Sequence, residues 1–300
     1  MYDATDPRAS LATAPPAATG EGIAAPEYFE FDTMAPAEVS PAGSRTWLVR
    51  GQNLVVAFTR LRGGDPLTRT GQPHEYLVLL TDPAAVVRIE AGGEDTAVNG
   101  AAVVVVPPGD SALTARADTT VVRAFDARTA DLAGRCHNAA SYAEPHPRVA
   151  PLEPWPEPVG GYRLRVYPVA DHPRREGSFG RIFRTSTLMV NFGDPVHGPR
   201  DTNRMSPHHH DDFEQISLTF AGDYVHHIRT PWTPRLGQWR ADEHRAVGSP
   251  SATVIPPPTV HTSQATGTGA NHLVDLFSPP RADFSAKPGW VRNADEYPVP

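Results

Sequence analysis

The feature of this sequence that most restricts its fold is the even spread of residues that interrupt regular structure. The 300 residues include 24 glycines and 33 prolines, which fall between short apolar runs along the whole chain. Proline removes a backbone donor and glycine weakens the interior of a helix, so long helices and long strands are disfavoured. Many short strands joined by turns are therefore expected, as in a β-sandwich or β-barrel.

The short apolar runs form two groups, and the chain is long enough for two domains. Residues 74–79 (HEYLVL) resemble residues 213–218 (FEQISL), and residues 103–112 (VVVVPPGDSA) resemble residues 252–261 (ATVIPPPTVH), in the same order. This order indicates an internal duplication, so we predict an all-β chain with two barrels. The predicted division is a flexible N-terminal arm (1–25), a first barrel (26–125), a linker with short helical and proline-rich stretches (126–160), a second barrel (161–280) and a C-terminal extension (281–300).

Charge, cysteine content and hydropathy argue against several classes of partner. The net charge is −7 with a pI near 6.0 and without a block of Lys or Arg, which disfavours nucleic acid and anionic membranes. Cys136 is the sole cysteine, so an intrachain disulfide and a cysteine-based zinc site are both excluded. Neither a secretory signal nor an apolar stretch of membrane-spanning length is evident. We expect a cytoplasmic protein with a small-molecule substrate, and leave a homodimer open.

The most informative segment for function is a cluster of histidines followed by an acidic residue. If residues 208–214 form a strand, then His208, His210 and Glu214 share one face and point into one barrel. His261, after three prolines, would complete a set of three imidazoles and one carboxylate, which suits Fe(II), Mn(II), Ni(II), Co(II) or Zn(II). The alternative is a polar loop, and a one-residue shift would exchange His209 for a neighbouring ligand.

These residues resemble the two motifs of the cupin superfamily. The first motif reads G-x5-H-x-H-x3-E-x6-G, and its metal-binding part matches His208, His210 and Glu214, although Gly222 comes one residue late. The second reads G-x5-P-x-G-x2-H and matches Pro256-x-Pro258-x2-His261, with proline in the glycine place. The resemblance implies double-stranded β-helix (cupin or jelly-roll) barrels, duplicated as in a bicupin.

The first module lacks these ligands. Ala112 stands where the last histidine belongs, and the adjacent His74 and Glu75 would face opposite sides of a strand. We therefore expect one divalent metal ion per chain, bound in the second barrel only, with Fe(II) favoured over the other metals.

Two more residues are predicted to face the metal. If Gly222-Asp223 is a two-residue hairpin turn, cross-strand pairing turns His227 and Arg229 inward, where they can move protons and anchor an anion. The alternatives are a structural histidine and a salt bridge at the barrel rim. A three-residue turn would instead place His226 inward and Arg229 in solvent.

The function that these features favour is that of a mononuclear Fe(II) oxygenase acting on a small organic acid or ketone. A redox-neutral isomerase, lyase or cyclase that uses the ion as a Lewis acid is the first alternative. A non-catalytic binding or storage bicupin is the second.

Overall fold

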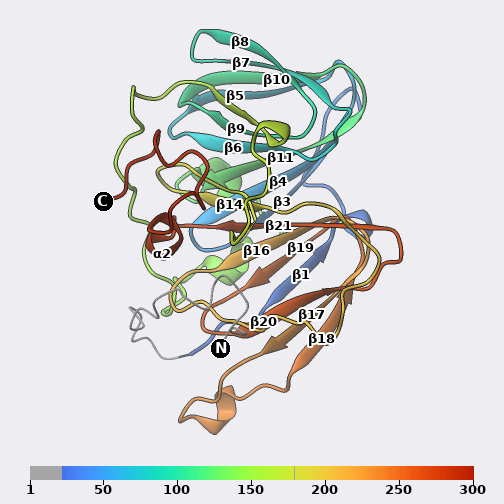
Figure 1. Cartoon of the computed structure of the whole chain (residues 1–300), viewed down its shortest axis with the longest axis vertical. Coiled ribbons are helices and arrows are strands. Elements are labelled where there is room, and N and C mark those ends of the chain that lie inside the picture. The colour runs from blue at the N-terminus through green and yellow to red at the C-terminus, as the bar shows by residue number, and fades with distance from the viewer. Residues whose placement is uncertain (1–21, 179) are drawn as a thin grey trace.

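The computed structural model describes residues 22–178 and 180–300 and consists mainly of β-strands, as predicted. Four sheets form two barrels, which occupy the upper and lower halves of Figure 1. Most of the arm predicted over residues 1–25 lies outside the described residues.

The first barrel combines a seven-stranded and a four-stranded antiparallel sheet. In spatial order, the larger sheet contains β12 (Arg165–Pro168), β9 (Ala102–Val106), β6 (Tyr76–Leu80), β11 (Thr119–Asp126), β4 (Leu54–Leu61), β3 (Arg45–Arg50) and β2 (Glu38–Val39). The smaller sheet contains β5 (Pro66–Gln72), β10 (Gly109–Ala115), β7 (Val86–Ala91) and β8 (Glu94–Asn99).

The second barrel repeats this plan with a seven-stranded and a three-stranded sheet. The larger sheet contains β1 (Glu27–Glu30), β19 (Ser251–Ile255), β16 (Gln215–Ala221), β21 (Ala270–Phe277), β14 (Met189–Phe192) and β13 (Ile182–Arg184), with β15 (Val196–His197) also paired to β21. The smaller sheet contains β18 (Glu243–Val247), β17 (Tyr224–Arg229) and β20 (Val260–Ala265).

Each barrel takes one edge strand from the far side of the predicted domain boundary. Strand β1 pairs with β19 of the second barrel, and β12 pairs with β9 of the first. The predicted ranges 26–125 and 161–280 therefore do not each contain all the strands of one barrel. Sequence pattern identified these segments as short and β-rich, but it carries no information on which of two similar sheet edges a strand will join.

The helices are single turns that lie in the connections. They are η2 (Phe31–Thr33), α1 (Ala130–Ala133), η3 (Ala139–Tyr142), η4 (Val169–Asp171), η5 (Leu236–Gln238) and α2 (Ala282–Ser285). Both α1 and η3 lie within the predicted linker. Within the described residues, no helix has the length and apolar character to cross a membrane.

The two large sheets pack against each other through their outer faces. One apolar cluster spans both barrels, with Trp47 and Phe58 from the first and Ile216, Leu218 and Val254 from the second. Because strand residues alternate between faces, Ile216 and Leu218 in this interface imply that Gln215, Ser217 and Thr219 face the interior of the second barrel.

The interiors of the two barrels differ sharply in polarity. The first barrel is filled by apolar side chains, among them Val78, Ile89, Val104 and Leu113. In the second barrel, Ser217 lies opposite Thr253 on β19 and Asp275 on β21, and these cross-strand partners share its inner face. The second barrel therefore has the polar interior that a metal or a polar ligand requires.

Candidate metal centre

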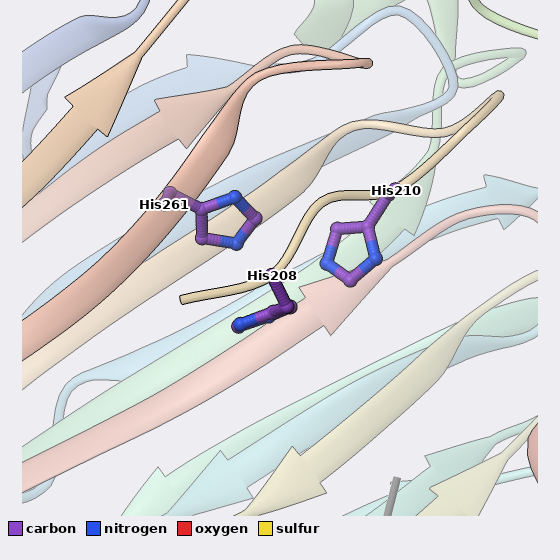
Figure 2. Close-up of side chains that lie close together, drawn as sticks. All are labelled: His208, His210 and His261. Carbon is purple, nitrogen blue, oxygen red and sulfur yellow. The ribbon is translucent and has the colours of Figure 1, made fainter. Parts of the chain in front are cut away.

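Three histidines from two separate segments converge in the second barrel. His208 and His210 come from the chain that leads into β16, and His261 comes from β20 (Figure 2). One ring nitrogen from each of the three lies within 4.8 Å of the others, so one ion can contact all three. Backbone hydrogen bonds in both directions between His208 and His261 fix the two segments side by side.

Hydrogen bonds to backbone carbonyls set the tautomers of two of these histidines. His208 Nδ1 lies 2.9 Å from the carbonyl oxygen of Ser206, and His261 Nδ1 lies 3.0 Å from that of Thr259. A carbonyl oxygen only accepts, so each Nδ1 carries the proton and each Nε2 presents a lone pair. This arrangement is the usual one for metal-binding histidines.

His210 is held between an arginine and a glutamine. Arg281 Nη1 donates to His210 Nδ1 at 2.9 Å, so the ring proton sits on Nε2, which donates to Gln215 Oε1 at 2.9 Å. Burial, followed by the charge of Arg281, keeps the pKa of His210 well below its usual value. The imidazole is therefore uncharged, as a metal ligand must be. Binding through Nε2 requires the ring proton to move to Nδ1, which breaks the hydrogen bond from Arg281.

Gln215 lies next to the three histidines, and we call these four residues the metal layer. Its Nε2 donates to Ser217 Oγ at 2.9 Å and to Asp275 Oδ1 at 3.0 Å, which leaves its Oε1 directed at His210. Two donors bound to one ion at right angles are roughly 3 Å apart when each bond is about 2.1 Å. The 2.9 Å between His210 Nε2 and Gln215 Oε1 matches that separation. The three imidazoles can thus hold a divalent metal, and the amide oxygen of Gln215 lies beside one of them.

A cavity of about 510 Å³ reaches this layer from the protein surface. Its walls include His208, Gln215 and His261 together with Asp275 and Arg200. The connection from Gly193 to Arg200 also contributes to the walls, as do the apolar residues Tyr224, Ala265 and Leu273. The site can therefore take a small molecule beside a bound metal.

Comparison with known proteins rests on structure alone, because no family model and no curated protein matches the sequence. Oxalate decarboxylase of Lactobacillus farciminis, solved as a formate complex, superposes with a TM-score of 0.57 at 13% identity, over 87% of this chain and 88% of that chain. A Bacillus subtilis oxalate decarboxylase studied for its Mn(II) centres has a TM-score of 0.50 at 11% identity, over 85% of this chain and 77% of that chain. AerE from Microcystis aeruginosa has a TM-score of 0.50 at 7% identity, over 87% of this chain and all of that chain.

This chain has a bicupin fold. The likeness extends over both barrels in each comparison, and the predicted fold class is confirmed.

The structure does not place Glu214 where it was expected from the sequence, and the spacing of the motif offers a different register. The first cupin motif places its glycine seven positions after its acidic residue, and Gly222 lies seven positions after Gln215 rather than after Glu214. By this spacing Gln215, and not Glu214, corresponds to the motif carboxylate. Residues 209–214 are not a strand, because Asp211 and Asp212 form a bend and β16 begins only at Gln215, so the assumed alternation from His208 to Glu214 does not hold.

Glu214 points away from the metal layer and binds the other barrel. Its carboxylate accepts hydrogen bonds from the backbone nitrogen of Gln52 at 2.5 Å, from Tyr142 Oη at 3.1 Å and from His146 Nδ1 at 3.0 Å. The neighbouring His209 also turns outward, with 38% of its side chain exposed beside Asp211. Neither residue joins the three histidines.

The predicted inward positions of His227 and Arg229 are also wrong. Strand β17 pairs with β18 and β20 and not with β16, so Gly222-Asp223 joins two facing sheets rather than a hairpin. Arg229 is an exposed residue paired with Asp242 at 2.5 Å, and His227 contacts His244 at 2.7 Å between Nδ1 atoms. These side chains lie on the outer face of the small sheet.

His226 takes the inward place on β17 instead, which was the alternative for a longer turn. It is fully buried and its Nδ1 lies 2.9 Å from Ser263 Oγ, two residues along β20 from His261. Burial, followed by the nearby His261, lowers the pKa of His226 to about 3.

Three residues beside the histidines were not predicted from the sequence. Gln215 was indicated by its spacing to Gly222, whereas Asp275 and Arg281 carried no recognisable sequence signal.

Proposed function

We propose that this protein is a metal-dependent enzyme that performs redox-neutral lyase or isomerase chemistry on a small substrate bearing a carboxylate. The observation that carries the proposal is one cavity in which His208, Gln215 and His261 meet the carboxylate of Asp275. Decarboxylation and proton-transfer reactions need two components, a group that stabilises negative charge on a substrate oxygen and a nearby acid or base.

The metal would be held by His208, His210 and His261, with the amide oxygen of Gln215 as a fourth donor. When bound, a divalent cation supplies Lewis-acid stabilisation of negative charge on a substrate oxygen. The donor set is formally neutral where the cupin motif has a carboxylate, so less of the cation's charge is offset by the protein. Mn(II) is our first choice, supported by the Mn(II) centres of the structurally similar Bacillus subtilis enzyme, and Fe(II) is the second.

Asp275 is assigned the role of acid and base. Its Oδ1 accepts hydrogen bonds from Gln215 Nε2 at 3.0 Å and from Ser217 Oγ at 2.7 Å, which fixes the carboxylate beside the proposed metal. Because Asp275 also lines the cavity, a proton held on its carboxyl group has a short path to a bound substrate.

Arg200 is assigned the role of binding the substrate carboxylate. Its guanidinium donates to Ser206 Oγ at 3.0 Å and to the carbonyl oxygens of Ser263 at 3.0 Å and Arg204 at 2.9 Å. These bonds hold the cation rigidly in the cavity wall, close to His208 through Ser206. A positioned arginine favours an anionic substrate over a neutral one.

An oxygenase is the second candidate. Three imidazoles and a neutral amide also suit Fe(II), and an ion with four protein donors keeps positions for substrate and dioxygen. The oxygenase requires no acid or base at the position of Asp275, which separates the two candidates.

The test is activity without oxygen. Metal-depleted protein reloaded with Mn(II), Fe(II) or Zn(II) is incubated anaerobically in deuterated buffer with a panel of small dicarboxylates and keto acids, and product formation and deuterium incorporation are followed by NMR. Turnover without oxygen is expected, together with its loss in Asp275→Asn and its retention in the surface control Asp242→Asn. Turnover that consumes oxygen, with Asp275→Asn fully active, would favour the oxygenase.

A further inference from the structure

The first barrel contains a buried arginine that forms no ion pair within the described residues. Arg123 on β11 lies opposite Ala57 of β4 and Val78 of β6, and both neighbours belong to the apolar filling of that barrel. Only 7% of Arg123 is exposed. Its side chain therefore enters the barrel interior and not the solvent.

The polar atoms of Arg123 are not satisfied by the protein. Its Nε has no hydrogen-bond partner within residues 22–178 and 180–300, and over the same ranges no carboxylate pairs with its guanidinium. Burial lowers the pKa of Arg123 most, and the charge of Arg69 lowers it further. Glu38 raises that pKa, but it is exposed and forms its ion pair with Arg135. A buried charge without a partner is strongly unfavourable, so this position calls for an anion.

The surroundings supply the rest of an anion site. The guanidinium carbons of Arg123 and Arg69 lie 5.8 Å and 5.6 Å from the centre of the Phe125 ring, on which Tyr76 stacks at 4.6 Å. The hydroxyl of Tyr76 lies 2.9 Å from Ser111 Oγ. Arg69 already pairs with Asp131 at 2.7 Å, so Arg123 is the cation beside this ring that has no ion pair in the described part of the chain, and the two hydroxyl groups lie near it.

The position of Arg123 corresponds to that of Asp275 in the second barrel. Arg123 pairs with Val78 of β6, as Asp275 pairs with Ser217 of β16, and β6 and β16 are equivalent strands of the duplicated fold. Both barrels therefore carry a charge at the same interior position. The negative one stands beside the proposed metal site, and the positive one forms no ion pair with any residue that the structure describes.

We infer that the first barrel holds a second binding site, for a small carboxylate anion that pairs with Arg123. A guanidinium matches a carboxylate through two parallel hydrogen bonds, and the apolar walls suit a short hydrocarbon chain better than a phosphate. The hydroxyls of Tyr76 and Ser111 are the additional donors. The site needs no metal and is independent of the function proposed for the second barrel.

The experiment measures thermal unfolding of the full chain in sodium acetate and in sodium chloride at equal ionic strength. Acetate at ten times its dissociation constant should raise the midpoint by roughly 2–5 °C. The same rise is expected in the double variant His208→Ala/Arg200→Ala, which removes the metal site and the carboxylate-binding arginine proposed for the second barrel. It should be absent when Arg123→Met is added to that double variant. Without acetate, Arg123→Met should unfold at a higher temperature than the parent protein, because a buried unpaired charge has been removed.

Two results would overturn the inference. One is an equal rise with acetate after Arg123→Met is added to the double variant, and the other is an equal rise of the parent protein in chloride. Arg123→Lys keeps the charge without the two-pronged geometry and provides a second variant if Arg123→Met does not fold. Acetate should raise the midpoint of Arg123→Lys by less than it raises that of the parent. A rise as large as that of the parent would also contradict a site built on the guanidinium.

Discussion

Replacing Gln215 by glutamate tests the assignment of this residue to the metal layer. The substitution restores the carboxylate of the cupin motif without a change in shape, but it sets that carboxylate against Asp275, whose Oδ1 lies 3.0 Å from Gln215 Nε2. Two negative charges at this separation repel by about 5 kcal/mol at an effective dielectric constant of about 20. Protonating a carboxyl of ordinary pKa at pH 7 costs about 4 kcal/mol, so the folded variant takes up a proton instead.

The metal-free variant should therefore lose up to about 4 kcal/mol of unfolding free energy at pH 7. The pH dependence of this loss follows from linkage. The pair formed by the introduced glutamate and Asp275 has a raised pKa in the folded state, so the loss of stability is small near pH 4 and grows as pH rises. The assay is urea unfolding of metal-free protein at pH 5 and pH 7, with Asp275→Asn and the double variant as controls. In the double variant the carboxylate and the amide have exchanged places, so most of the stability should return.

Metal content provides the second readout for the same variant. A bound divalent ion neutralises the added charge, so Gln215→Glu should bind the metal more tightly than the parent protein and should regain stability when metal is added. The reasoning is refuted if the variant unfolds at the parent's urea concentration at both pH values. It is equally refuted if Asp275→Asn fails to compensate, since the amide would then not lie against Asp275.

Three more predictions follow from the same structure. Replacing any of the three converging histidines by alanine should abolish stoichiometric metal in elemental analysis, whereas Arg229→Ala should keep both the metal and the kinetics of the parent. Glu214→Ala should leave the metal affinity nearly unchanged but lower the unfolding free energy by about 3–5 kcal/mol, because it leaves buried donors without an acceptor. His226 is buried with a pKa of about 3, below its unfolded value, so its contribution to folding stability is present above about pH 6.5 and is lost as pH falls. Between pH 7 and pH 5, a His226→Asn variant should therefore lose less unfolding free energy than the parent, by roughly 2 kcal/mol.

The fold was largely predictable because it depends on features that are local in sequence. Short apolar runs separated by glycine and proline predicted strands, and the repeated order of two segments predicted two barrels, as the structure has them. The exchange of β1 and β12 between the barrels was not predictable. It depends on which of two similar sheet edges accepts a strand, and that is decided by packing between distant parts of the chain.

The errors at the site have two origins, the assumption of an unbroken strand from His208 onward and the interpretation of Gly222-Asp223 as a hairpin turn. Strand alternation holds only where the backbone is extended, and the bend at Asp211 and Asp212 ends that condition. The face of β16 was consequently inverted. Independently, β17 was assigned to a hairpin with β16, whereas it pairs with β18 and β20 in the facing sheet. In the sequence, the late position of Gly222 already indicated the first error, because the motif spacing to this glycine fits Gln215 and not Glu214.

The duplication itself distinguishes the structural glutamate from the metal layer. Glu75 occupies the same place before β6 as Glu214 does before β16, and each reaches across to the other barrel. Glu75 accepts hydrogen bonds from the backbone nitrogen and Oγ of Ser186, both at 2.8 Å, and from Tyr297 Oη at 3.0 Å. The first barrel has this glutamate although it lacks the histidines. The glutamate therefore belongs to the interface between the barrels and not to the metal site. The metal layer is instead built where the barrels differ, with Gln215 in one and Tyr76 at the equivalent place in the other.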